Sequence, residues 1–481
     1  MFLTERQNSS RAKIAIMQWL LLIAGVISSV AVFNAARPRR GHRTTLVAGF
    51  FASWLTIELA FHWLVVVVAV AAVGIAGGGA EHPAGLLGLL LLAQSAVGLA
   101  SLGREGLRTG RQMDQALMDL SSRSSAGAGA GAGAGAAARP GVRFPWSHVV
   151  LPVLMQRRAG VRRVRDIEFA RVGGKTLRLD LTLPADTQPG EKRPVLLQIH
   201  GGAWIISDKR DQGQPLMNHL ATQGWVCVNA NYRLSPGATF PDHLIDTKRA
   251  LAWISEHVAD FGGDPEYVCI TGGSAGGHLA AMVALTANQA RYQPGFEDVD
   301  TSVKAAVPFY GIYDLTNRLG TYPDHFYSRL LEPLVMKAFL ADEPERFEEA
   351  SPIDQVHALA PPFLVVHGDR DSIVPLPDTR LFVERLREVS HQPVLYAELK
   401  GAQHAFDVFP SVRCARVVEG VERFLTTLWE GAVGAAPVAE LTSGESGPDG
   451  GAAGEAKAAA PPGVEVRTGA ETDGAGELSV G

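Results

Sequence analysis

Cysteine is scarce in this chain, which has only Cys227, Cys269 and Cys414 among 481 residues. Three scattered thiols are too few for a disulfide scaffold or for a tetrahedral zinc site built on cysteine. We therefore expect no structural disulfides, no metal ion and no cofactor.

An excess of positive charge is also missing. Lysine and arginine together number 44 against 49 acidic residues, a formal net charge of -5, and aromatic residues make up 7% of the chain. A nucleic-acid binder built on a basic face is thereby disfavoured. The length points to two or three structural units of roughly 150 residues each.

Charge is absent from long stretches of the first 111 residues. Residues 14–33 and 84–102 contain no charged side chain, and residues 46–79 are interrupted only by Glu58 and His62. A helix of about 20 apolar residues spans the roughly 30 Å hydrocarbon layer of a bilayer. Residues 1–111 are therefore predicted to be a multi-pass anchor in the cell membrane, with about three transmembrane helices.

Arginines flank these apolar stretches and indicate an orientation. Four lie between residues 37 and 43, and three lie between residues 104 and 111. Placing both groups inside satisfies more charge than the reverse, although Arg6, Arg11 and Lys13 argue the other way. The C-terminal domain is then expected in the cytoplasm.

Glu58 and His62 are four residues apart, so one helix would carry them on a shared face. Ionisable residues within a membrane segment either pair and pack together or mark a proton or ligand path. Both interpretations stay open from the sequence.

Two segments have the composition of chain without a packed core. Residues 112–142 include the Gly/Ala run SSRSSAGAGAGAGAGAAARP and are predicted to be a linker that acts as a tether. Residues 431–481, rich in Ala and Gly with an excess of acids, are expected to be a disordered tail.

Residues 143–430 show the pattern of an α/β domain, because short apolar runs alternate with helical segments. The expected strands lie at residues 195–199, 226–229, 267–271, 305–308 and 363–366. Such alternation predicts a doubly wound, mostly parallel sheet. Functional residues of these sheets gather at the carboxyl ends of the strands.

One loop at such an end has a nucleophile pattern. The strand at 267–271 is followed by Gly-Gly-Ser-Ala-Gly-Gly, which places Ser274 in a G-x-S-x-G turn that opens a helix. A second loop, His-Gly-Gly-Ala-Trp at residues 200–204, follows the strand at 195–199. Its glycines allow backbone N–H groups to approach a developing oxyanion, and the N–H of Ala275 adds to them.

A serine nucleophile needs a general base and a carboxylate that orients it. Asp369 and Asp371 both follow the strand at 363–366, and His404 comes 33 residues after Asp371. The order Ser, Asp, His is the one found in α/β hydrolases.

These motifs, in this order, resemble the α/β-hydrolase carboxylesterases of the hormone-sensitive-lipase-like and feruloyl-esterase-like groups. The resemblance covers about residues 167–428 and includes Asn-Tyr-Arg-Leu-Ser-Pro at residues 231–236. The HGGAW loop and the G-x-x-D-x-x-V-P pattern around Asp371 are closer to the feruloyl-esterase-like branch. Gly273 stands where the lipase branch usually has Asp, and no Asp-Pro-Leu motif is present.

The resemblance implies a role for each site residue. Ser274 corresponds to the nucleophile, His404 to the base, and Asp371 rather than Asp369 to the orienting carboxylate. The oxyanion donors are implied to be the N–H groups of Gly202, Ala203 and Ala275. The implied protein is a membrane-anchored serine carboxylesterase or lipase-like hydrolase, which acts on small-molecule or lipid esters through an acyl-enzyme and uses no cofactor.

Two other classes stay open. A serine peptidase of the oligopeptidase type shares the elbow and the carboxylate turn, but no propeller-like repeats precede the domain. A non-catalytic membrane interaction protein built on a hydrolase scaffold is the other alternative.

Overall fold

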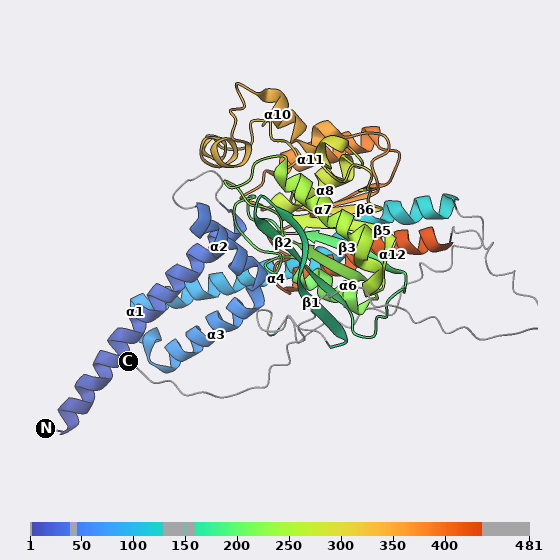
Figure 1. Cartoon of the computed structure of the whole chain (residues 1–481). Helices are drawn as coiled ribbons and strands as arrows, with labels where there is room; N and C mark the ends of the chain where they lie inside the picture. Colours follow the sequence, from blue (N-terminus) through green and yellow to red (C-terminus); the bar gives the residue numbers. More distant parts are fainter. Residues whose placement is uncertain (1, 39–45, 128–149, 151–158, 435–481) are drawn as a thin grey trace, which may run out of the picture. The chain divides into compact units, whose positions relative to one another are not determined.

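The computed structural model describes residues 2–38, 46–127, 150 and 159–434 (Figure 1). Three of the arginines that flank the first apolar stretch (Arg39, Arg40 and Arg43), residues 128–142 of the expected linker and the expected tail from residue 435 lie outside these ranges.

An eight-stranded sheet forms the centre of the C-terminal part, with the strand order β1-β2-β4-β3-β5-β6-β7-β8. The strands are β1 (Val161–Val172), β2 (Lys175–Pro184), β3 (Arg193–Ile199), β4 (Val226–Ala230), β5 (Gly263–Gly273), β6 (Ala305–Phe309), β7 (Phe363–Gly368) and β8 (Val394–Leu399). β2 pairs antiparallel with β1 and β4, and all other neighbours are parallel. The predicted doubly wound, mostly parallel sheet is confirmed, and the five predicted strands are β3 to β7.

Helices cover both faces of this sheet because the strands carry apolar side chains on both sides. One face packs against α7 (Asp242–His257), α8 (Ala275–Leu285) and α11 (Leu376–Val389). The other packs against α6 (Gln214–Thr222) and α12 (Val412–Gly434), and its buried residues include Cys227 and Cys269. Between β6 and β7 lie four short elements: α9 (Asp324–Phe326), η4 (Tyr327–Met336), α10 (Pro344–Glu349) and η5 (Pro352–Gln355).

The N-terminal part is helical: α1 (Phe2–Ala36), α2 (Leu46–Glu58), α3 (Ala60–Ala76) and α4 (Pro83–Gly127), with the short turn η1 (Gly79–Glu81) before α4. Within the described residues, α1 and α4 each contain a stretch long and apolar enough to cross a membrane. The pair α2 and α3 passes the same test only together, across a bend of 87°. Two helices, or three with the bent pair, agree with the predicted number of about three.

Glycines let α1 and α4 pack closely. A Cβ at Gly88 would lie 2.5 Å from the carbonyl carbon of Leu21, and a Cβ at Gly98 would lie 2.4 Å from Cγ1 of Val32. Small residues permit this kind of backbone approach between helices. Since residue numbers rise together on both helices, α1 and α4 run in the same direction.

α3 runs the opposite way and returns to the start of the apolar part of α1. A Cβ at Gly77, directly after α3, would lie 2.9 Å from Cε of Met17. At the other end of α1, the side-chain amide of Asn34 donates to the carbonyl oxygen of Gly49 in α2, at 2.7 Å. The end of α1, all of α2 and the later part of α4 therefore lie at the same end of the bundle as the sheet domain.

α4 continues past residue 111, where the sequence analysis places the start of a linker. Met113 and Leu120 are buried in the same hydrophobic cluster as α12 and the sheet, and a Cβ at Gly420 of α12 would lie 2.5 Å from Cε of Met113 (Figure 1). The linker boundary at residue 112 was therefore wrong, because residues 112–127 are helical and the first turns pack on the sheet domain. The apolar spacing of Met113, Leu117 and Leu120 is the helical signal that the Gly/Ala run concealed.

Glu58 and His62 do not form a pair. α2 ends at Glu58 and the chain bends by 87° before α3, so the two residues do not share a helix face. Glu58 instead accepts from Nε of Arg413 at 3.0 Å and from Oγ of Ser411 at 2.5 Å. His62 lies 3.3 Å from the carbonyl oxygen of Val150. The interpretation as a mutually paired couple was wrong, because the helix breaks between them.

The Glu58–Arg413 ion pair predicts a stability effect. The two side chains are 1% and 2% exposed, so Glu58→Ala would leave a buried guanidinium without its carboxylate. Breaking such a pair typically costs about 3–5 kcal/mol. We expect a clearly lower melting temperature for the full-length variant in detergent. The matched control is Asp114→Ala, which removes an exposed pair with Arg423 and should cost at most about 1 kcal/mol. Equal melting temperatures for the two variants would contradict the expectation.

Candidate active site

Ser274 occupies the tight turn between β5 and α8. Its backbone has φ 59° and ψ -121°, a conformation that side-chain-bearing residues rarely adopt. The N–H of Ser274 donates to the carbonyl oxygen of Phe309 at 3.0 Å, and a Cβ at Gly276 would lie 2.1 Å from the carbonyl oxygen of Ile199. The turn therefore requires glycine beside the serine, which is why the G-x-S-x-G pattern folds this way.

The loop after β3 lies against this turn. A Cβ at Gly201 would lie 3.1 Å from Cβ of Ser274. Gly202, Ala203 and Trp204 have φ angles of 100°, 53° and 60°, so three successive residues adopt left-handed conformations. In the described part of the chain, no hydrogen bond uses the N–H of Gly202, Ala203 or Ala275 as a donor. These three groups are thus available to a bound molecule.

Side chains from the next strand hold this loop. The hydroxyl of Tyr232 donates to the carbonyl oxygen of His200 at 3.1 Å, and the two rings stack with centroids 4.4 Å apart. Burial lowers the pKa of His200, so its ring is neutral at pH 7. Arg233 in turn binds the buried carboxylate of Asp246 through Nε and Nη2, at 2.6 and 2.9 Å. His200 thus braces the turn, which explains why tyrosine and arginine follow β4.

Asp371 and His404 come together at the carboxyl ends of β7 and β8. These strands are parallel neighbours, so the loops that follow them lie at the same edge of the sheet. Nδ1 of His404 is 2.7 Å from Oδ2 of Asp371. The other oxygen, Oδ1, accepts the N–H groups of Ile373 and Val374, each at 2.8 Å. The residues expected to act as base and orienter are therefore joined directly.

The environment of Asp371 favours its charged form. Burial by itself raises the pKa of this carboxyl, but the charge of His404 and the hydrogen bonds from His367 and His404 outweigh it and hold the pKa below its ordinary value. Nε2 of His367 lies 3.2 Å from Oδ2, and Nδ1 of His367 contacts Oγ1 of Thr379 at 2.8 Å. The sequence gives no hint of this second histidine beside Asp371.

Asp369, the rival carboxylate, has a different partner. Its Oδ1 accepts the N–H of Gly401 at 2.6 Å, a contact that joins the two loops. The carboxylate that accepts from His404 is that of Asp371.

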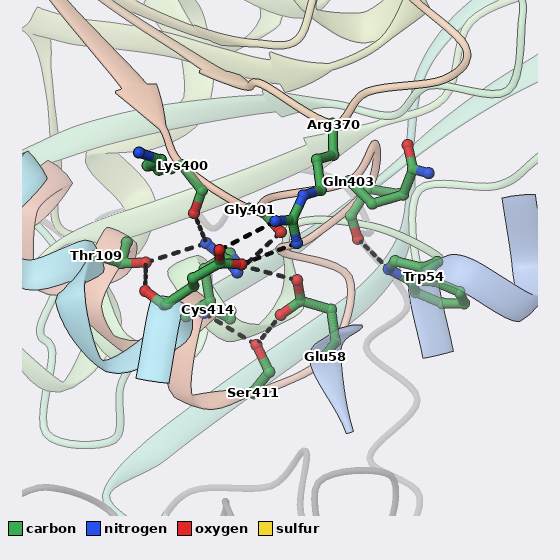
Figure 2. A network of polar contacts seen from close by, with 12 residues as sticks. Trp54, Glu58, Thr109, Arg370, Lys400, Gly401, Gln403, Ser411 and Cys414 are labelled. Atoms are coloured by element: carbon green, nitrogen blue, oxygen red, sulfur yellow. Dashed lines mark hydrogen bonds and ion pairs between the residues drawn. The ribbon is translucent and has the colours of Figure 1, made fainter. Parts of the chain in front are cut away.

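Gln403 is a site residue that the sequence analysis missed. Its Oε1 accepts the N–H groups of His404 and Ser372, at 2.9 and 2.8 Å, and its Nε2 donates to Oγ of Ser53 at 2.6 Å. Figure 2 shows Gln403 close to Trp54, whose Nε1 donates to the carbonyl oxygen of Ala405 at 2.9 Å. Residues of α2 thus contact the loop on both sides of His404, and no motif predicts contacts between positions 350 residues apart.

Tyr310 explains why glycine stands at position 273. The Tyr310 ring lies 4.4 Å from that of His404, and its hydroxyl donates to the buried carboxyl of Asp407. A Cβ at Gly273 would lie 2.7 Å from the Tyr310 hydroxyl. The aspartate usual in the lipase branch would therefore displace this tyrosine. Burial raises the pKa of Asp407, which places a second buried acid near His404.

A polar cavity of about 540 Å³ lies between α4 and the β8 edge of the sheet and includes none of Ser274, Asp371 or His404. Among the described residues, no group of three or more His, Cys, Asp or Glu side chains is arranged to hold a metal ion.

Comparison with known proteins agrees with this geometry. The BD-FAE family profile matches residues 179–386. The chain is 40% identical over 414 residues to the probable carboxylic ester hydrolase LipM of Mycobacterium tuberculosis, a match that covers 85% of this chain and 93% of LipM. It is 48% identical over 263 residues to the esterase LipQ of the same organism, which covers 55% of this chain and 62% of LipQ.

A solved structure of a thermophilic esterase from Thermogutta terrifontis is 25% identical, with a TM-score of 0.48, and the match covers 61% of this chain and 99% of that one. The resemblance stated from the motifs is confirmed by the family profile and the relatives, including the feruloyl-esterase-like branch. Of the three classes left open by the sequence, the relatives support ester hydrolysis. The chain belongs to the α/β-hydrolase family of carboxylic ester hydrolases, and it is an enzyme of that family.

Proposed function

We propose that this enzyme is a membrane-anchored serine carboxylesterase with the triad Ser274, His404 and Asp371. The observation that carries the proposal is the 2.7 Å hydrogen bond between His404 and Asp371, at the edge of the sheet where the Ser274 turn also lies. A nucleophile in a strained elbow, a histidine and a buried carboxylate in this chain order form the catalytic constellation of α/β hydrolases.

The reaction would proceed in two halves. Ser274 Oγ attacks the ester carbonyl carbon while His404 Nε2 accepts the hydroxyl proton, which gives a tetrahedral intermediate with a negative oxygen. The carbon–oxygen bond of the ester then breaks, and His404 returns the proton to the departing alcohol. Water attacks the acyl-enzyme by the same sequence and releases the carboxylic acid.

The negative oxygen would be bound by the N–H groups of Gly202, Ala203 and Ala275. The left-handed backbone at residues 202–204 turns successive N–H groups in one direction, and Ala275 begins α8, where N–H groups have no partner within the helix. Asp371 would stay ionised throughout, because its pKa lies below the ordinary value, and would hold the His404 tautomer that leaves Nε2 free to accept a proton.

The anchor would place this site at the surface of the cell membrane. α1, α3 and α4 run alternately through the bundle, and α3, with 17 residues, is at the lower limit of spanning length. The bend of 87° would then leave α2 near the plane of the membrane. Arginines at residues 37–43 and 104–111 fall at the end of the bundle that carries the hydrolase domain, which favours a cytoplasmic site. The substrates would be small-molecule or lipid esters.

Ser274→Ala should abolish most ester hydrolysis. We expect full-length protein in detergent to hydrolyse p-nitrophenyl butyrate, and the variant to lose about 10³-fold or more in kcat because it lacks the nucleophile. A fluorophosphonate should label Ser274 in the unsubstituted protein. Ser302→Ala, a change at an exposed serine, serves as the control and should leave turnover unchanged. Ester turnover with unlabelled Ser274 would contradict the assignment.

The two aspartates should differ sharply. Asp371→Asn should lower kcat by about 10⁴-fold, since the amide favours the wrong histidine tautomer. Asp369→Asn keeps an oxygen for the N–H of Gly401 and should cost less than about tenfold. Steady-state kinetics on the same ester would decide, and the opposite ranking would move the triad to Asp369.

A further inference from the structure

Helix α2 contacts the His404 loop on both sides of the histidine. Gln403, directly before His404, donates to Oγ of Ser53 at 2.6 Å, and Ala405, directly after it, accepts from Nε1 of Trp54 at 2.9 Å (Figure 2). The ring of Phe50 meets the His404 imidazole edge-on, with centroids 6.2 Å apart. The flanks of His404, and one side of its ring, are thus held by a helix more than 300 residues earlier in the chain.

The Gln403 amide has no freedom to turn around. Its Oε1 accepts two N–H groups, from His404 and Ser372, so its Nε2 must be the end that faces Ser53. The Ser53 hydroxyl donates to the carbonyl oxygen of Phe50 at 3.2 Å and therefore accepts from Gln403. Ser53 and Gln403 are both fully buried, so loss of either partner would leave a polar group without a hydrogen bond.

Trp54 restrains a strained part of the same loop. Ala405 has φ 60°, which is unfavourable for a residue with a Cβ. The indole N–H is a donor only, and it binds the carbonyl oxygen of this residue. The bond therefore favours the backbone conformation that directs His404 toward Asp371.

A second set of contacts fixes the two ends of the loop. Glu58 binds Arg413, whose Nη1 and Nη2 donate to the carbonyl oxygens of Lys400 and Gly401, at 3.0 and 3.1 Å (Figure 2). On the Asp371 side, Arg370 donates to both carboxylate oxygens of Glu105 in α4, at 2.8 and 3.0 Å.

We propose that α2 is a positioning element of the active site, in which Ser53 and Trp54 set the place of His404 relative to Asp371 and Ser274. Neither residue touches the reacting atoms, and both act through the backbone and amide of the His404 loop. The inference rests on the proposed function, because it assigns His404 as the base. It changes the role of the anchor from a tether to a part of the catalytic apparatus, so full activity requires α2 to be docked.

Two substitutions test the proposal in the full-length protein in detergent. Trp54→Phe keeps an aromatic ring but removes the N–H donor, and Ser53→Ala removes the acceptor for Gln403. A misplacement of about 1 Å can cost about 100-fold in rate, so we expect kcat to fall by about 10- to 100-fold in each variant. kcat/KM should fall by the same factor with KM unchanged, because positioning of the base matters in the transition state. Leu55→Ala, on the same helix with its side chain partly exposed, is the matched control and should retain the unsubstituted kcat.

The rates are expressed per serine titrated by a fluorophosphonate at complete labelling. A purely structural role would reduce the number of titrated sites and leave kcat per site unchanged, and that result in both variants would overturn the proposal. If Trp54→Phe gives no folded protein, Ser53→Ala alone decides by the same criterion. Absence of both turnover and labelling in the unsubstituted protein would instead overturn the proposed function, and this inference with it.

Discussion

The arrangement of the site depends on a buried carboxylate that must be satisfied. Asp371 is 1% exposed, and its two oxygens accept from the N–H groups of Ile373 and Val374 and from the rings of His367 and His404. A charge in this setting is tolerated only with such partners. Because one of these partners is His404, the loop after β8 has to stay against the loop after β7, and everything that holds the two loops together bears on the histidine.

The N-terminal helices hold these loops from outside the hydrolase fold. Ser53, Trp54 and Glu58 lie along α2 and contact the His404 loop or its end, and Glu105 of α4 binds Arg370 in the Asp371 loop. The later turns of α4 also complete the hydrophobic cluster beneath the sheet through Met113 and Leu120. A hydrolase domain separated from these helices would expose apolar surface and leave Arg413 buried without its carboxylate. The anchor and the hydrolase therefore form one cooperative structure, in which a membrane segment supports a catalytic loop.

Local chemistry explains what could be predicted from the sequence. Alternating apolar runs predict the strands, and the turn that follows β5 needs small residues around Ser274, so fold and elbow are visible in short windows. The apolar stretches likewise predict the membrane helices. The break at Leu59 was missed, since residues 46–79 are apolar on both sides of it. The packed turns of α4 were missed because a Gly/Ala-rich composition outweighed the helical spacing of Met113, Leu117 and Leu120.

Contacts between distant segments could not be predicted at all. Gln403 and Ser53 are 350 residues apart, and an isolated serine in an apolar helix is usually bonded to its own backbone. His367 beside Asp371 depends on the curvature of two loops, which no spacing rule supplies. Glu58 was noticed as an unusual acid, but its partner Arg413 lies in α12, so the sequence offered His62 as the nearer choice.

Hydrogen exchange of the His404 loop tests most directly whether α2 holds it. Amide exchange would be followed by mass spectrometry in the full-length protein and in Trp54→Phe, both in the same detergent. The account predicts faster exchange in residues 400–411 of the variant, with unchanged exchange in β5, because only the loop loses its external donor. Identical exchange of residues 400–411 in the two proteins would contradict the claim that the anchor positions the catalytic loop.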